Sequence, residues 1–285
     1  MPLVPLHKAL AKALKGRYAL GAFNAVSADF LEAILAAAKS ERSPVIVNLA
    51  EVHFPYLTPE RLAPVVKAWI KDCPVDVVLN LDHGKSFESC VRAAKAGFSS
   101  VMIDGSSLPY AQNAALTRKV VKHCHAKGVS VEAELGSVGG EEGGVAKVPS
   151  SGLFTDPAQA AEFMRATGAD ALAVAIGNAH GRYQGVPKLD FRRLAQIRRA
   201  CRAPLVLHGG TGIPAAGFRR AIGMGVAKIN YYTGMSQAAL AATRKGLEKG
   251  GRNYNEYPDL AAAVKSAVRA EVAAQMRVFM SSGKG

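Results

Sequence analysis

The chain has 285 residues, of which 49% are hydrophobic, so it can bury one large core, and we expect a single domain over residues 1–285. Its four cysteines are scattered and no signal peptide precedes them, which excludes a disulfide framework and leads us to expect a cytoplasmic protein. No apolar run approaches the roughly 20 residues that span a bilayer, so we expect no membrane as partner. The basic residues that give the net charge of +14 recur singly or in pairs, so we expect no nucleic acid as partner either.

Short apolar runs alternate with stretches of helical periodicity along the whole chain. The helical stretches include residues 28–41 and 87–97, and the second ends on Gly97, a natural C-cap. The runs that we expect to form strands are 18–24, 44–50, 75–83, 99–105, 129–136, 171–177, 203–209 and 226–230.

This alternation predicts a parallel sheet that is covered by helices on both faces, because its strands read as continuous apolar runs. Eight such units without a break in composition favour a (β/α)₈ TIM barrel. A doubly wound open sheet is the alternative. It is disfavoured because the segment after the first run, "GAFNAVS", lacks the glycine fingerprint of that fold.

Polar or ionisable side chains end the apolar runs. In a TIM barrel the active site lies at the carboxyl ends of the strands, so these side chains are expected to surround one pocket. They are Asn24, residues 48–51, Asp82, His83, Asp104, Glu132, Glu134, His180, His208 and Asn230. Burying such groups without partners costs roughly 2–7 kcal/mol even when they are uncharged. A shared functional site therefore explains them better than burial alone.

Three of the seven histidines fall at or just past strand ends, namely His83, His180 and His208, and Glu134 ends another run. One such histidine is more often a hydrogen-bonded core residue. Three from separate strands, together with a carboxylate, suit Zn²⁺ with an open coordination position, although cobalt or iron could use the same ligands. The other four histidines are expected at the surface: His7, His53, His123 and His125.

Glycine-containing segments follow two of these histidines, in "HGRY" (180–183) and "HGGTGIP" (208–214). Backbone N–H groups of residues 209–211 could cradle a phosphate, with Asn230 and Thr233 closing around it. Such glycines are also common in plain turns, but TIM barrels often bind phosphate after strands seven and eight. A further glycine-rich segment, 136–152, is either a surface loop or a lid that carries Glu142 to the substrate.

Taken together, these motifs resemble the class II, metal-dependent fructose- and tagatose-bisphosphate aldolases. The resemblance extends from about residue 18 to the C-terminus and is carried by "LDHG", "VMIDGS", "VEAELG", "GGEE", "AVAIGNAHG", "LVLHGGTGIP" and "KIN". It implies an aldolase that reversibly cleaves a ketose phosphate to dihydroxyacetone phosphate and an aldehyde through a zinc-stabilised enediolate. Fructose 1,6-bisphosphate or a related ketose 1-phosphate would be the substrate, and a homodimer or homotetramer the working form.

The resemblance also implies roles for individual residues. His83, Glu134, His180 and His208 match metal ligands. Asp82 matches the group that exchanges a proton with the C4 hydroxyl, and Glu142 matches the group that moves the C1 proton of the donor. Asp104 and Glu132 match carboxylates behind the ligands or at an alternate metal position. Asn24 and Asn230 match amides that bind the donor. The residues that match a phosphate cradle, beside a monovalent-cation site, are Gly181, Gly209, Thr211 and Thr233.

The chain departs from the family pattern at three places. Ala50 stands where a hydroxyl side chain is expected, Tyr232 stands where an aspartate or a small residue is usual, and residues 251–264 lack an Asp-Pro-Arg pattern. The missing arginine removes a counter-charge for a distal phosphate. We therefore predict dihydroxyacetone phosphate as the donor together with an altered aldehyde partner.

Two other interpretations remain open from the sequence. Lys228 near the end of the eighth run could form a Schiff base, as in a class I aldolase, but the three histidines would then have no role. Alternatively, the protein is a non-catalytic, aldolase-like binding or assembly subunit. Ala50 and Tyr232 favour that interpretation, whereas the intact metal set and Glu142 oppose it.

Overall fold

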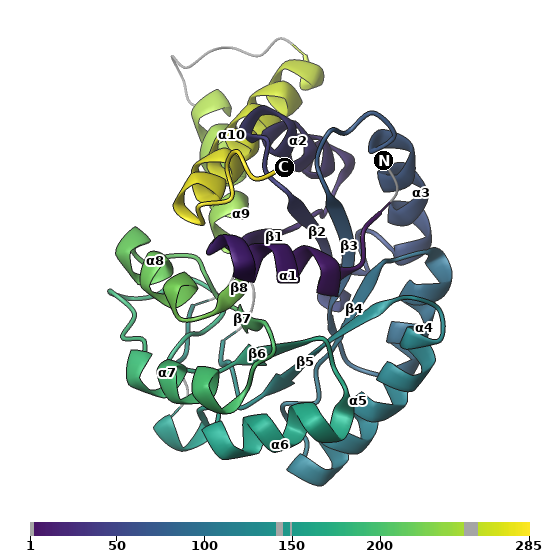
Figure 1. The fold of residues 1–285 in the computed structure, drawn as a ribbon. Coiled ribbons are helices and arrows are strands. Elements are labelled where there is room, and N and C mark those ends of the chain that lie inside the picture. Colours follow the sequence, from purple (N-terminus) through teal and green to yellow (C-terminus); the bar gives the residue numbers. More distant parts are fainter. Residues whose placement is uncertain (1–2, 141–144, 149, 248–255) are drawn as a thin grey trace.

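A computed structural model describes residues 3–140, 145–148, 150–247 and 256–285. Eight parallel strands pair in sequence order and close into a barrel, with helices between them on the outside (Figure 1). The strands are β1 Leu20–Asn24, β2 Val45–Ala50, β3 Val77–Gly84, β4 Ser100–Ile103, β5 Ser130–Leu135, β6 Ala171–Val174, β7 Leu205–Leu207 and β8 Val226–Tyr231. The predicted TIM barrel is thus confirmed.

The helices begin and end as follows: α1 Leu6–Gly16, α2 Ala28–Glu41, α3 Pro59–Trp69, α4 Phe87–Ala96, α5 Tyr110–His125, α6 Pro157–Thr167, α7 Phe191–Ala200, α8 Ala215–Gly223, α9 Thr233–Leu247 and α10 Tyr257–Val278. Two 3₁₀ turns, η1 Glu51–His53 and η2 Ser151–Leu153, lie between them. Serine caps start two of the helices soon after a strand. Ser27 accepts a hydrogen bond from the N–H of Phe30, and Ser86 from that of Ser89.

Several strands are shorter than expected, among them β4, β6 and β7, and the early end of β6 bears on the site. The run 171–177 predicts a long sixth strand, but β6 ends at Val174. The next two backbone N–H groups bind side chains instead of a neighbouring strand: that of Ala175 donates to Thr155 Oγ1, and that of Ile176 donates to Asn178 Oδ1. The chain therefore leaves the barrel early and carries His180 over its rim.

The barrel interior changes from apolar to polar along its axis. Helix α1 lies across the amino end of the ring of strands (Figure 1) and packs Leu6 and Leu10 into an apolar layer that includes Ile46 and Val78. Because side chains repeat on one face every second residue, the inward position after Val78 is Asn80, and the next is Asp82. The polar layer at the carboxyl end is where the predicted site residues lie.

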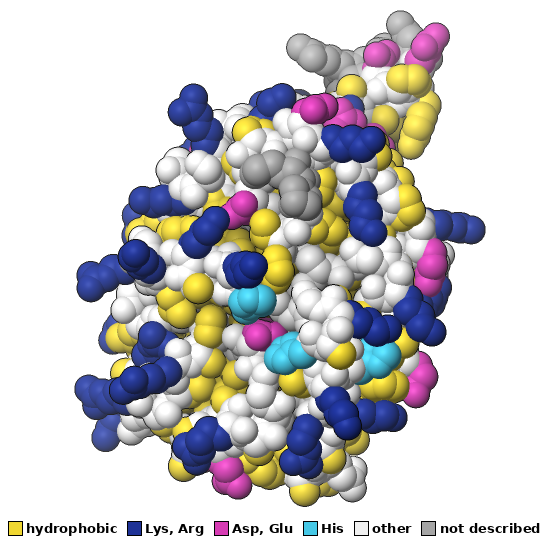
Figure 2. All heavy atoms as spheres, turned by 45° about the vertical axis from the view of Figure 1, so that its right-hand side comes forward, with side chains coloured by type: hydrophobic (Ala, Val, Ile, Leu, Met, Phe, Trp, Pro, Cys, Tyr) yellow, Lys and Arg dark blue, Asp and Glu magenta, His cyan; other side chains and the backbone are white. Residues whose placement is uncertain are grey.

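Lys and Arg side chains are spread over the face in Figure 2 and do not gather into one patch. All four cysteines are buried and unpaired. No helix in the described part of the chain is both long and apolar enough to cross a membrane.

Candidate active site

His83 has an unusual backbone at the end of β3. Its φ is 47°, in the left-handed region that residues other than glycine rarely adopt, and the pairing of β3 with β4 shifts register between Leu81 and Gly84. In a regular strand Asp82 and His83 would face opposite sides of the sheet. The irregular backbone instead lets both side chains face the same site, and such strain is found mainly where function requires it.

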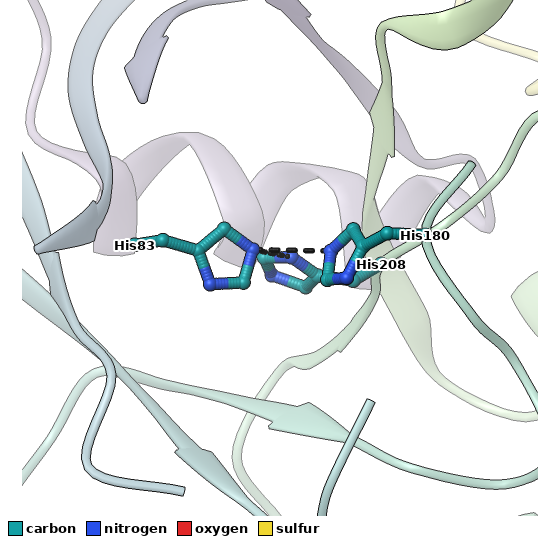
Figure 3. A group of neighbouring side chains, drawn as sticks. All are labelled: His83, His180 and His208. Carbon is teal, nitrogen blue, oxygen red and sulfur yellow. Dashed lines mark hydrogen bonds between the residues drawn. The ribbon is translucent and has the colours of Figure 1, made fainter. Parts of the chain in front are cut away.

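The rings of His83, His180 and His208 meet at the mouth of the barrel (Figure 3). Nε2 of His83 lies 3.1 Å from Nε2 of His180 and 2.9 Å from Nδ1 of His208. The three come from separate segments, at the end of β3, beyond β6 and just past β7. The structure thus brings together the three histidines that the sequence singles out.

Carboxylates behind two of these rings define which nitrogens carry protons. Nδ1 of His83 lies 3.0 Å from Asp104 Oδ2, and Nε2 of His208 lies 2.9 Å from Glu132 Oε1. Because an ionised carboxylate only accepts hydrogen bonds, the ring nitrogen facing it must carry the proton. When both rings are neutral, as metal ligands are, the other nitrogens of His83 and His208 direct lone pairs at each other across 2.9 Å. Two facing lone pairs repel, and a cation between them removes that repulsion, so this set of donors fits a metal ion.

Glu134 lies on a different side of His83 from the three-imidazole group. Its Oε2 is 3.9 Å from Nδ1 of His83, and its Oε1 accepts a hydrogen bond from the N–H of Val138. Oε2 is buried and has no hydrogen-bond partner among the described residues. His83, Asp104 and Glu134 form a second group whose ligand atoms all lie within 4.8 Å of one another. Glu134 can therefore serve a metal either beside the three imidazoles or at this neighbouring position.

Protonation of the metal-free site follows from its burial and its charges. Burial opposes a charge on His83, but Asp82, Asp104 and Glu134 outweigh it and raise the pKa of His83 to about 10. Burial, aided by Asp104, raises the pKa of Glu134 to about 8. For His180, burial and the charge of His83 lower the pKa well below its usual range. At neutral pH the metal-free site therefore holds protons that a metal ion must displace.

Metal affinity is accordingly expected to rise with pH. Each displaced proton changes the apparent affinity roughly tenfold per pH unit at pH values below the pKa of the group that releases it. We expect His83 to release one proton up to about pH 10, and Glu134 a second below about pH 8 if it is a ligand. Competition with a chelator between pH 6 and 9 measures the slope; an affinity that does not vary with pH would contradict this account of the site.

Asp82 lies beside the histidines with one oxygen held and one available. Its Oδ1 accepts a hydrogen bond of 2.8 Å from Nδ2 of Asn230, while Oδ2 is buried with no hydrogen-bond partner in the described part of the chain. Burial raises the pKa of Asp82, but the charges of His83 and Lys228 outweigh it, and the net shift is downward. The carboxylate is thus ionised and its Oδ2 can accept a proton from a hydroxyl group.

A polar pocket next to His180 contains the residues expected to hold phosphate. It is lined by His180, Gly181, Gly209, Gly210, Thr211, Asn230, Tyr232 and Thr233. Gly209 has a φ of 65°, and a Cβ there would lie 2.0 Å from the carbonyl oxygen of Ala179, so only glycine fits. Helix α9 begins at Thr233, and the N–H of Gly234 donates to Thr211 Oγ1. Backbone N–H groups and a helix N-terminus together favour an anion.

The predictions for the remaining residues have mixed outcomes. Asn24 is buried at the end of β1, in register with Asn48. Glu142 lies outside the described residues. His7 and His125 are exposed as predicted, and His123 is half-buried against Phe87.

The prediction that His53 lies at the surface is wrong. Its exposed fraction is 7%, because the turn η1 after β2 folds it onto the ring of Tyr232, with the two ring centroids 4.8 Å apart. Burial lowers the pKa of its imidazole, and the charge of Asp82 opposes that shift. His53 is a site residue that sequence reasoning missed. Its position, three residues beyond the end of β2 on the catalytic side of the barrel, was the available signal.

The barrel and this set of side chains define the class of the protein: a TIM-barrel enzyme with a histidine-rich site at the carboxyl ends of its strands. Residues 4–284 match the family described as "Fructose-bisphosphate aldolase class-II". The chain belongs to this family, whose members are metal-dependent lyases that cleave a carbon–carbon bond. Membership argues against the Schiff-base alternative. Lys228, the candidate nucleophile, is fully buried and paired with Glu132.

Relatives with similar sequences and structures cover nearly the whole chain. A fructose-bisphosphate aldolase of Geobacillus stearothermophilus is 44% identical over 100% of this chain and 99% of its own length. A probable fructose-bisphosphate aldolase of Bacillus subtilis is 42% identical over 100% of both. Among solved structures, the YdjI aldolase of Escherichia coli K12 has a TM-score of 0.88 and 34% identity over 99% of both chains.

Proposed function

We propose that the protein is a zinc-dependent aldolase that reversibly cleaves a ketose phosphate to dihydroxyacetone phosphate and an aldehyde. Fructose 1,6-bisphosphate or a related ketose 1-phosphate is the proposed substrate. The observation that carries the proposal is the convergence of three imidazole nitrogens, 2.9 and 3.1 Å apart, between Asp82 and the glycine-lined pocket. The names of the relatives support the same reaction.

Separate groups of residues would bind the phosphate of the donor and the metal ion. Gly181, Gly209, Thr211 and Thr233 would bind the phosphate of the donor through the backbone and hydroxyl groups of the pocket. His83, His180 and His208 would hold Zn²⁺, and Glu134, which groups with His83 and Asp104, would serve a metal at the neighbouring position. When bound, Zn²⁺ supplies a Lewis acid for the negative charge that develops on the donor's carbonyl oxygen.

Asp82 carries the proton transfer in this proposal. Its Oδ2 would take the proton of the C4 hydroxyl during cleavage and return it during condensation. Asn230 fixes the carboxylate through Oδ1, so that the free oxygen keeps one orientation. Glu142 is proposed to move the C1 proton of the donor.

A second cavity, of about 200 Å³, lies on the other side of His180 and is proposed to receive the aldehyde. Its lining includes Ala50, Val52 and Val138, and Lys85 is its only lysine or arginine among the described residues. The ammonium group of Lys85 is already paired with Asp104. A distal phosphate placed here would lack a free counter-charge in the described part of the chain.

We therefore expect a preference among substrates. The kcat/KM for a ketose 1-phosphate with an uncharged distal end should exceed that for fructose 1,6-bisphosphate by roughly tenfold, the effect of about 1.4 kcal/mol from one unmatched charge. Release of dihydroxyacetone phosphate, measured with and without a chelator, gives both rates. Equal rates, or a preference for the bisphosphate, would refute the altered specificity. The absence of cleavage with either substrate by zinc-loaded protein would refute the proposed function.

Four further points belong to the same proposal. The chain works as one aldolase domain over residues 1–285 and assembles as a homodimer or homotetramer, as the family resemblance implies. A monovalent cation binds beside the phosphate pocket. The protein functions in the cytoplasm, which its four free, buried cysteines support.

A further inference from the structure

Lys228 places a charge in the interior of the barrel. It is the third residue of β8, its side chain is fully buried, and its Nζ lies 2.7 Å from Oε2 of Glu132 on β5, which is also fully buried. Either charge alone at this depth would carry a large desolvation penalty. The pair lies below the metal site, on the side of α1, and contacts neither the phosphate pocket nor the proposed aldehyde cavity.

The other oxygen of Glu132 connects this pair to the proposed metal centre. Oε1 lies 2.9 Å from Nε2 of His208, and Nδ1 of the same ring lies 2.9 Å from Nε2 of His83. A continuous series of contacts thus runs from Lys228 through Glu132 and His208 to the point where the three imidazoles meet. Each of the first three members is fully buried, so water does not screen their interactions.

The contact between Glu132 and His208 determines which ring nitrogen can face a metal. A carboxylate oxygen that accepts the N–H of Nε2 leaves the lone pair on Nδ1 free for a metal. The ammonium group of Lys228 lies 2.7 Å from Oε2, the other oxygen of the same carboxylate. Lys228 thus holds one end of the carboxylate while the other end contacts His208.

We propose that Lys228 is a positioning residue of the metal centre: its ammonium group holds Oε2 of Glu132, so that Oε1 keeps its contact with Nε2 of His208 and Nδ1 of that ring faces the metal position. This inference rests on the metal site of the proposed function. A purely structural role would differ from this one. In that case Lys228 and Glu132 would only neutralise each other's charge, and any neutral, well-packed pair could replace them without a change in metal binding at His208.

The test measures metal binding directly, by competition of Zn²⁺ with a chelator and by the visible absorption spectrum of bound Co²⁺. Lys228→Met leaves Glu132 without its counter-charge and is expected to weaken Zn²⁺ binding by roughly 10- to 100-fold, the usual effect of losing a partner behind a ligand. It should also change the Co²⁺ spectrum. Lys12→Met is the matched control, because Lys12 forms a 2.6 Å ion pair with Asp76 at the surface, and it should change neither measurement.

Two double variants keep the test decisive if Lys228→Met does not fold, since neither contains an unpaired buried charge. Lys228→Met with Glu132→Gln retains an oxygen that can accept from His208, and should bind Zn²⁺ within a few-fold of the unaltered protein. Lys228→Met with Glu132→Leu lacks that acceptor and should bind 10- to 100-fold more weakly. Equal affinities for the two double variants, or an unchanged affinity in a folded Lys228→Met protein, would overturn the inference. Failure of the unaltered protein to bind Zn²⁺ would instead overturn the proposed function.

Discussion

Replacement of His180 by alanine is expected to prevent tight zinc binding and to lower kcat/KM by on the order of 10³. His180 supplies one of the three converging nitrogens, and its loss leaves only two imidazoles of this group for the metal. The stabilisation that a metal gives to a developing negative charge is several kcal/mol, which corresponds to that loss of rate. Metal content after dialysis and cleavage rates at saturating Zn²⁺ measure the two effects.

His125→Ala is the matched control for this variant, because His125 is an exposed histidine that pairs with Asp170 outside the site. It should retain both metal and activity. A His180→Ala protein that bound Zn²⁺ stoichiometrically and cleaved substrate at the unaltered rate would show that the three-imidazole group is not the metal centre.

Asp82→Asn is expected to lower kcat for cleavage by roughly 10²- to 10⁴-fold, the usual contribution of a general acid–base group. Asparagine has nearly the same shape and can still accept from Asn230, but it cannot take the proton of a hydroxyl group. Because the proposed role of Asp82 is confined to the C4 hydroxyl, exchange of the C1 proton of dihydroxyacetone phosphate should continue in this variant.

The measurement compares the two rates in one preparation whose zinc content has been determined. Continued exchange with lost cleavage supports the assignment. Loss of both rates with zinc still bound would mean that Asp82 acts in the enolisation step, and the division of roles proposed above would be incorrect.

The barrel could be predicted from the sequence because a parallel sheet buried on both faces leaves a strong signal. Each of the eight expected runs overlaps one strand of the barrel. The predicted sixth strand is too long because residues 175–177 are as apolar as the strand before them. Beyond β6, Thr155 Oγ1 accepts from the N–H of Ala175, and Asn178 Oδ1 accepts from that of Ile176. The first contact joins residues 20 positions apart and cannot be read from local composition.

Residue type and position at a strand end were sufficient to predict the metal ligands. The contacts that orient those ligands could not be predicted in the same way. The sequence places His83, Asp104 and Glu134 at strand ends, yet it does not show which nitrogen of His83 faces which partner. That assignment depends on the left-handed backbone at His83 and on the register shift beside it. Lys228 was considered only as a nucleophile, because its contact with Glu132 crosses the barrel from β8 to β5.

His53 was predicted to be exposed, but it is buried against the lining of the phosphate pocket. It lies in a short turn between β2 and α3, where exposure is the usual outcome. Its burial requires the ring of Tyr232, which is 179 positions away in the sequence and is itself a departure from the family pattern. The contact joins two segments far apart in the sequence and could be recognised only in three dimensions.

The measurement that tests the central claim most directly is exchange of the C1 proton of dihydroxyacetone phosphate in heavy water, because it requires no knowledge of the aldehyde partner. We predict that the protein catalyses exchange, that EDTA abolishes it, and that Zn²⁺ restores it. Exchange that persists in protein shown to be free of metal, or no exchange when the zinc site is fully occupied, would contradict the proposed metal-assisted aldolase.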